Sequence, residues 1–461
     1  MGEQPLGRLL ARYSLPAIAG FLANALYQFA DRIIVGRGVG TLGMAAVTAA
    51  FPLSIVGMAV ALLLGTGTGN RIAVLLGQQN RDEAERVLGQ SVRLGLILGI
   101  ALALLTWAFT RPILIACGCE VRLLPMAIPF ARILAVGQIF VIVLISMGNI
   151  LRVQGRPMLG LGLMLGSNAL NVCLALIAVY VLHLGVKGTA LATSLSQVVG
   201  CLLVVSFAQS RWSVLHIRRY FLRADRAIAR SIITLGAPFG LMQVLATLVF
   251  LAANRGAASQ AGSRGLATLG VLNTVAMLLI YPSLGVMQAM MPLVGFNRGA
   301  GRPDRVYGLL MRVLVTSLGM GVFFAALIAV IPGPVAALFS KTDPELIAMV
   351  RRGLPWFVIP VTLFGVTGTM AHYFLAAHEP RKAAVLLLGR QILAMPLFLV
   401  LPRLFGFYGM YLAAPLADLP LAVIGTIFML SEAGHLKAAI AQKANGAQAG
   451  GTLAAGEPAA G

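Results

Sequence analysis

Long apolar stretches separated by short polar segments recur along the whole chain. An α-helix needs roughly 20 predominantly apolar residues to cross the hydrocarbon core of a bilayer, and twelve stretches meet this requirement. They lie at residues 14–36, 43–74, 91–110, 125–150, 158–182, 186–208, 229–254, 264–294, 307–331, 353–377, 383–402 and 407–430. The pattern therefore predicts an all-α polytopic membrane protein with twelve transmembrane helices.

Composition supports the same class of protein. Of the 461 residues, 59% are hydrophobic and 11% are charged, whereas a soluble domain carries about 25% charged residues. Residues 1–12 are polar and the first apolar stretch is a full span, so we expect no cleavable signal peptide.

Basic residues favour one orientation in the membrane. If both termini face the cytoplasm, 23 of the 35 Lys and Arg residues fall in cytoplasmic segments, as the positive-inside rule requires. We therefore expect a multi-pass protein of the plasma (cytoplasmic) membrane with both termini inside. The net charge of +21 is spread over these loops, so anionic lipid headgroups are its expected partner and nucleic acid is not.

Four pairs of segments match each other in order and at nearly constant spacing. At offsets of 219–223 residues, the pairs are Pro16 with Pro238, Val87 with Val306, Pro157 with Pro380, and Gly185, Gly188 and Ala192 with Gly406, Gly409 and Ala413. The matches indicate two homologous halves of six spans each. Because six is even, both halves enter the membrane from the same side, related by a pseudo-symmetry axis along the membrane normal.

The repeat divides the chain into four parts. We predict an N-terminal six-helix bundle at 1–208, a cytoplasmic linker at 209–228, a C-terminal six-helix bundle at 229–435 and a disordered cytoplasmic tail at 436–461. Many secondary transporters are built from paired halves around a central site. A duplication kept only for packing is the alternative.

Nothing in the sequence favours catalysis or a bound cofactor. There is no G-x-x-x-x-G-K-[ST] motif, no H-E-x-x-H motif and no soluble segment large enough for a nucleotide site. Cys117 and Cys119 form C-x-C near an outer loop. No other Cys, and of the histidines only His183, is placed near an outer loop, so this motif alone is no metal site. We expect a monomeric protein that is not an enzyme and has no cofactor and no metal.

One predicted span carries a carboxylate on a polar face. Asn24, Gln28 and Asp31 stand at i, i+4 and i+7, so they share one side of the first helix. A carboxylate inside a bilayer costs at least about 2.5 kcal/mol and usually has a function. A salt bridge is the alternative, but the neighbouring Arg32 points about 100° away on the helix. We predict that Asp31 binds the coupling ion.

Other polar residues in the spans are less easily assigned. Asp418 lies in the twelfth span between Pro415 and Pro420, so it either binds an ion or serves a broken helix backbone. The fifth and sixth spans add Ser167, Asn168, Asn171, Thr193, Ser196 and Gln197. These residues either converge with Asp31 or sit at helix–helix contacts.

Several segments together resemble the multidrug and toxic compound extrusion (MATE) transporters. They are "ADRIIVGRGVG" after the first span, "NALNVCLALI…LGVKGTALATSLSQ" at 168–197, "GLPWFVIP" opening the tenth span and "HYFLAAHEPRKA" closing it. The likeness covers about residues 5–435. It implies a twelve-helix transporter that exports amphipathic, often cationic compounds as H⁺ or Na⁺ enters.

The resemblance also implies an ion site in the N-terminal half. Asp31, Asn171 and Thr193 match three of the family's four residues, and Asn24, Gln28, Asn168 and Gln197 are expected to support them. At the place of the family's Asp on the fifth span this chain has Ala175, and the Glu that some members carry on the seventh span is missing, with Ala246 near its expected place. One carboxylate among neutral ligands favours H⁺ over Na⁺ as the coupling ion.

We expect the substrate cavity to lie between the halves, lined by the first, second, seventh and eighth spans. Its predicted lining residues are Gln28, Thr48, Gln243, Asn273 and Met287. Two other functions remain open: a flippase for an anionic lipid-linked precursor, which would need cationic side chains in this cavity, and a membrane receptor or scaffold, which would leave the Asp31 face unexplained.

Overall fold

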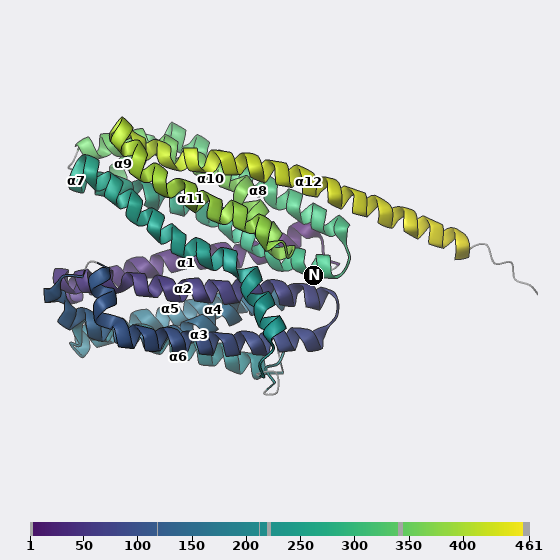
Figure 1. Ribbon diagram of the computed structural model, residues 1–461, viewed down its shortest axis with the longest axis horizontal. Coiled ribbons are helices and arrows are strands. Elements are labelled where there is room, and N and C mark those ends of the chain that lie inside the picture. The colour runs from purple at the N-terminus through teal and green to yellow at the C-terminus, as the bar shows by residue number, and fades with distance from the viewer. Residues whose placement is uncertain (1–2, 118, 212, 219–222, 340–343, 455–461) are drawn as a thin grey trace, which may run out of the picture.

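The computed structural model describes residues 3–117, 119–211, 213–218, 223–339 and 344–454, and its regular elements are all helices (Figure 1). The N-terminal half comprises α1 (Leu6–Gly38), α2 (Gly40–Gly77), α3 (Arg81–Ala116), α4 (Leu124–Val153), α5 (Pro157–Leu176) and α6 (Gly185–Gln209). The C-terminal half comprises α7 (Arg226–Gly299), α8 (Pro303–Val330), α9 (Pro332–Phe339), α10 (Pro344–Ala376), α11 (Pro380–Phe405) and α12 (Tyr408–Ala454). A 3₁₀ turn, Val121–Leu123, precedes α4, and a π-helical turn, Ile177–Val181, follows α5.

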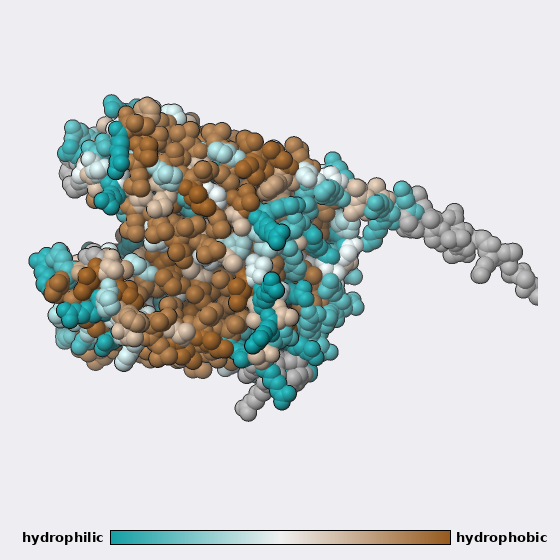
Figure 2. All heavy atoms as spheres, viewed as in Figure 1, coloured by the Kyte–Doolittle hydropathy of each residue, from teal (hydrophilic) through white to brown (hydrophobic). Residues whose placement is uncertain are grey.

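The described residues contain twelve helices that are long and apolar enough to cross a membrane, which confirms the predicted number. Helix α7 supplies two of them, Arg226–Gly262 and Arg264–Gly299. They join at a kink where Gly262 has φ 54°, a conformation that glycine adopts at little cost. Figure 2 shows the consequence for the surface: a band of hydrophobic residues lies between two hydrophilic ends.

Local sequence explains where several helices begin. Asn80 caps α3 by accepting a hydrogen bond from the Glu83 amide, and Asp225 caps α7 by accepting from the amides of Ala227 and Ile228. A side-chain acceptor at this position satisfies amides that have no partner inside the helix. Proline stands in the first turn of α4, α5, α8 and α11, where its missing N–H costs nothing.

The two halves form two bundles, α1–α6 and α7–α12, that lie one above the other in Figure 1. The N-terminus, the linker before α7 and the end of α12 gather at one end of the molecule. We call this the linker end and the opposite one the far end. Helix α12 continues to Ala454, so most of the segment predicted to be a disordered tail is helical, and residues 455–461 lie outside the described part.

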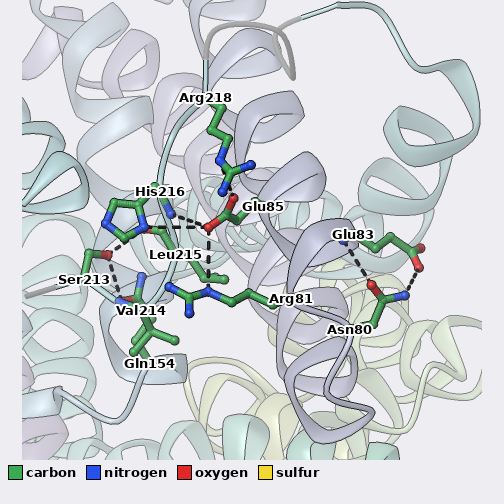
Figure 3. A network of polar contacts seen from close by, with 10 residues as sticks. All are labelled: Asn80, Arg81, Glu83, Glu85, Gln154, Ser213, Val214, Leu215, His216 and Arg218. Carbon is green, nitrogen blue, oxygen red and sulfur yellow. Dashed lines mark hydrogen bonds and ion pairs between the residues drawn. The ribbon is translucent and has the colours of Figure 1, made fainter. Parts of the chain in front are cut away.

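The linker between the halves is fastened to the N-terminal half (Figure 3). Glu85 of α3 is only 2% exposed. Its carboxylate accepts a hydrogen bond from the His216 amide at 3.1 Å and pairs with Arg218 Nε at 3.1 Å. Gln154 Oε1 accepts from Ser213 Oγ and from the Val214 amide. The linker therefore belongs structurally to the first half.

The first turns of α1, a helix of the N-terminal half, pack against the C-terminal half. Leu9, Leu10 and Tyr13 are buried in an apolar core built mainly from α7, α8 and α10, all of the C-terminal half. Farther along α1, Ile34 packs instead with α5 and α6 of its own half. Helix α1 thus contacts both halves, with its N-terminal part at the seam between them.

Candidate functional site

At the linker end the two halves touch through their backbones. A Cβ atom on Gly67 of α2 would collide with the carbonyl oxygen of Ile232 in α7, and a Cβ on Gly236 would collide with that of Leu63. Glycine is the residue that permits such an approach. A larger side chain at Gly67 or Gly236 would push α2 and α7 apart.

A second pair of glycines makes the same kind of contact and does so reciprocally. Gly77 of α2 faces the Phe296 carbonyl of α7, and Gly299 of α7 faces the Val74 carbonyl of α2. Gly77 and Gly299 are 222 residues apart, as are Val74 and Phe296. Such mutual contacts are expected where a two-fold axis passes between two equivalent helices.

Polar contacts add to this closure. Arg152 Nη1 of α4 donates a hydrogen bond to Gln288 Oε1 of α7 at 2.5 Å. His378, in the turn after α10, hydrogen-bonds to the backbone of Asn70 in α2. The far end differs, because Figure 2 shows the surface hollowed there between the two halves. The structure is thus closed between the halves at the linker end and open at the far end.

Asp31 lies on α1 within the N-terminal half and is half-buried. None of the ion pairs found among the described residues involves it. One helical turn earlier, Tyr27 interacts electrostatically with Asp31 and hydrogen-bonds to the Thr193 side chain of α6. The Thr193 hydroxyl also donates to the Thr189 carbonyl of its own helix at 3.0 Å.

Tyr27 is the residue that sequence reasoning missed. It reads as part of the apolar run of the first span, although its i−4 spacing from Asp31 places both on one face of the helix. That spacing and the phenolic hydroxyl are the signals by which the sequence could have indicated it.

Asn171 and Thr193 are joined through Ser196. Asn171 Nδ2 of α5 donates to Ser196 Oγ at 3.2 Å, and Ser196 Oγ donates to the Thr193 carbonyl at 2.8 Å. Ser167 Oγ donates to the Ser196 carbonyl at 3.1 Å. The structure therefore joins Asn171 and Thr193 through Ser196, and Tyr27, one helical turn before Asp31, hydrogen-bonds to Thr193.

Buried polar atoms near this network lack partners. Among the described residues, Asn168 Nδ2, Asn171 Oδ1 and Gln197 Oε1 are buried without a hydrogen bond, and most buried polar atoms in proteins have one. Gln197 Oε1 lies beside Gly137 of α4, where α6 packs against α4. Asn24 is half-buried on α1.

Ala175, at the position where the resemblance leads us to expect an Asp, is part of an apolar cluster. It is 1% exposed and packs with Ile34 of α1, Ala192 of α6 and Val179 of the turn after α5. The cluster includes the π-helical turn Ile177–Val181 through Val179; such turns often occur near functional sites. No group of three or more His, Cys, Asp or Glu side chains in the described ranges is arranged to hold a metal ion.

Asp418, unlike Asp31, is paired with a basic residue. It is 3% exposed, and its Oδ1 accepts a hydrogen bond from Arg390 Nε of α11 at 2.5 Å. Its other oxygen has no partner among the described residues. Asp418 is thus held in an ion pair inside the C-terminal half.

Four of the predicted cavity residues are at least partly accessible, and the fifth is buried. Gln28 and Thr48 are exposed, and Gln243 and Asn273 are half-buried. Met287 is fully buried and packs against α10 in the core of the C-terminal half. The assignment of Met287 to an open cavity is therefore wrong, because an apolar residue on a helix does not reveal whether its side faces the core or the cavity.

Comparison with known proteins agrees with this architecture. The family model described as MatE matches residues 16–177 and again 238–400. The multidrug export protein MepA of Staphylococcus haemolyticus is 24% identical over 432 residues, covering 93% of this chain and 94% of that protein. MepA of Staphylococcus aureus strain MSSA476 is 23% identical over 420 residues, covering 90% and 92%.

Solved structures share the fold. A multidrug resistance MATE family transporter in an outward-facing conformation matches with a TM-score of 0.87 at 24% identity, covering 94% of this chain and 97% of that one. A MATE structure in complex with MaL6 matches with a TM-score of 0.88 at 24% identity, covering 94% and 98%. Since the two family matches together span more than half of its length, the chain belongs to the MATE family of transporters.

Proposed function

We propose that this protein is a secondary active efflux transporter that exports amphipathic or cationic organic compounds in exchange for protons. The named relatives are multidrug export proteins, which supports this substrate class. The neutral side chains of Gln28, Thr48, Gln243 and Asn273 at the predicted cavity favour such compounds over an anionic lipid-linked precursor.

Alternating access is the transport mechanism that the arrangement of the halves supports. The halves meet through glycine-mediated backbone contacts at the linker end and part at the far end (Figure 2). We place the linker end in the cytoplasm of a cell whose plasma membrane holds the protein as a monomer. The described conformation is then the outward-facing one, and rocking of the halves produces the other.

The observation that carries the choice of proton is the surroundings of Asp31. The neighbouring network of Tyr27, Thr193 and Asn171 is neutral, and Ala175, in an apolar cluster, stands where a second carboxylate is expected. A single carboxylate and a few hydroxyl and amide groups suit a proton, because Na⁺ requires several oxygen ligands and gains most from anionic ones. Protonation neutralises Asp31 and removes its attraction for a cationic substrate.

The test is flux of a cationic dye through the purified protein in proteoliposomes. A pH gradient alone, acidic on the side of the far end, should drive the dye toward that acidic side, against the direction in which protons flow. A Na⁺ gradient of equal size at constant pH should not drive it. Dye movement that follows the Na⁺ gradient and ignores the pH gradient would overturn the assignment of the proton.

A further inference from the structure

A groove with a volume of about 570 Å³ lies at the seam between the two halves, away from Asp31 and its neighbours. One wall is α1, through Gly7, Ala11 and Leu15, and the other is α8, through Arg312 and Val315. Its lining residues are Gly7, Leu10, Ala11, Ser14, Leu15, Ile18, Val286, Met311, Arg312, Val315, Thr316 and Met320.

The groove is bounded at both ends by contacts between the halves. Leu6 of α1 meets Gly308 of α8 at one end, and Ile18 of α1 meets Gly285 of α7 at the other. The stretch from Gly7 to Ile18 is roughly 16 Å long at 1.5 Å per helical residue. Small residues at Gly7 and Ala11 leave this space open beside α8.

The outer walls of the groove are apolar and belong to membrane-spanning helices. Leu15 is 67% exposed and Val315 is 69% exposed, within the spans Leu6–Gly38 and Pro303–Val330. Apolar side chains that are exposed within a membrane span face the hydrocarbon chains of lipids. An acyl chain is therefore the occupant that matches the shape and polarity of the groove.

Arg312 and Ser14, two of the three polar residues that line the groove, distinguish it from an ordinary lipid-facing surface. Arg312 is exposed at its edge, and no ion pair among the described residues involves it. Ser14, which also lines the groove, is 6% exposed, and its hydroxyl has no hydrogen-bond partner in the described part of the chain. Both groups are donors suited to phosphate or glycerol oxygens.

The depth of Arg312 agrees with a headgroup contact. It stands nine residues into α8, which has 28 residues, or roughly 14 Å along a helix about 42 Å long. A hydrocarbon core of about 30 Å leaves roughly 6 Å of helix outside at each end. The long side chain of an arginine at this depth reaches the interface, where the phosphates lie. Arg8 and Arg12 are exposed on α1 beside Leu15 and add positive charge to the same edge.

We propose that this groove binds one anionic phospholipid, with an acyl chain between α1 and α8 and its phosphate on Arg312. A lipid bound there contacts both halves, since α1 begins the first half and α8 belongs to the second. The site is separate from the proposed proton and substrate sites, and its test requires no transport.

The experiment is native mass spectrometry of the purified protein with phosphatidylglycerol and phosphatidylcholine of the same acyl chains. Wild-type protein should retain one phosphatidylglycerol in preference to phosphatidylcholine. Arg312→Gln should lower that preference about fivefold, the effect expected for one basic residue near a membrane surface. Ala11→Phe should fill the groove and reduce retention of both lipids, and Val315→Trp provides a second filling variant at an exposed position.

Arg93→Gln is the matched control. Arg93 of α3 is the counterpart of Arg312, at the offset of 219 residues that relates Val87 to Val306, and it does not line the groove. This variant should keep the wild-type preference. Equal loss in Arg93→Gln and Arg312→Gln would show diffuse attraction of charge and overturn the proposal. Undiminished retention in folded Ala11→Phe and Val315→Trp, or equal retention of both lipids by the wild type, would overturn it as well.

Discussion

Gly77 of α2 and Gly299 of α7 occupy equivalent positions in the two halves, and each lies against a backbone carbonyl of the other's helix. The reciprocity places the pseudo-two-fold axis between these helices at the linker end. It also means that neither position tolerates a side chain while the halves are in contact there. These glycines therefore determine whether the linker end can close.

Substitution of Gly77 by leucine should shift the protein toward a state open at the linker end. Overpacking a tight contact costs about 1–3 kcal/mol, which changes the ratio of closed to open molecules roughly 5- to 150-fold. Spin labels at the exposed positions Gln78 and Asp304 would report the distance across the linker end. We expect longer distances in the variant and loss of efflux.

Gly319→Leu is the control for this substitution, because Gly319 of α8 has open space where its Cβ would be. It should leave both the distance distribution and efflux unchanged. A Gly77→Leu protein that keeps the short wild-type distances would show that the glycine contacts do not control closure.

His378 should make closure at the linker end depend on pH. In the closed structure burial, with help from Arg71 and Arg298, lowers the pKa of His378 from 6.5 to about 4. When the linker end opens, the ring becomes solvated and its pKa returns toward 6.5. Above pH 6.5 the ring is neutral in both states. As pH falls from 6.5 to 4 only the open state binds the proton, and opening gains about 1.4 kcal/mol per pH unit.

The same spin-label pair measures this effect. Between pH 7.5 and pH 5 the open fraction of the wild type should rise, by a free energy of roughly 2 kcal/mol. The informative quantity is the difference between the wild type and His378→Gln, because this difference cancels every contribution that does not come from His378. Identical pH profiles for the two proteins would contradict the role given to His378.

Replacing Arg390 and replacing Asp418, the two partners of an ion pair, should lower the stability of the protein by different amounts. The Asp418 side chain is 4% exposed, whereas that of Arg390 is 35% exposed. Arg390→Gln leaves a buried, unpaired carboxylate and should lower stability by about 3 kcal/mol. Asp418→Asn leaves an arginine whose long side chain can reach the membrane interface, and should cost less. Thermal unfolding in detergent measures both.

The double variant Arg390→Gln with Asp418→Asn serves as the control, and it should recover most of the stability lost in Arg390→Gln. Asp418→Asn should also retain efflux driven by a pH gradient, since we assign Asp418 a structural role. A stable Asp418→Asn protein without such efflux would instead make Asp418 a second coupling residue.

The number of spans could be predicted because a bilayer requires about 20 apolar residues per helix. The ends of the helices could not be predicted, because hydropathy marks only the part of a helix inside the hydrocarbon core, and the backbone hydrogen bonds of the helix continue beyond it. The first span, predicted at 14–36, belongs to a helix from Leu6 to Gly38. Its first turns are anchored by Leu9 and Tyr13 in the other half, a tertiary contact that local pattern does not encode.

The candidate site could be predicted only in part. The i, i+4 and i+7 spacing identified the polar face of Asp31, but its neighbour Tyr27 reads as an apolar residue. The partner of Asp418, Arg390, is 28 residues away on an adjacent helix, and no periodicity connects them. Met287 reads like any apolar residue of a span, and only the packing of α7 against α10 shows that it is buried.

Ala175→Asp should create a protein that responds to Na⁺. A carboxylate placed in the apolar cluster with Ile34 and Ala192 loses hydration and should lower stability by about 2–3 kcal/mol. A bound cation would offset this charge. We expect Na⁺ to raise the melting temperature of Ala175→Asp, and to leave that of the wild type and of the neutral control Ala175→Asn unchanged. An equal response of all three proteins to Na⁺ would contradict this account of the site.

The central claim is that protonation of Asp31 couples efflux to the proton gradient. Its most direct test is dye transport by Asp31→Asn in proteoliposomes under a fixed pH gradient. Asparagine keeps the size and hydrogen bonding of the side chain and cannot carry the charge, so the variant should fold, insert and show no transport driven by pH. Asp304→Asn, which neutralises an exposed carboxylate at the start of α8, should transport like the wild type. Transport by Asp31→Asn at the wild-type rate under the same gradient would contradict the claim.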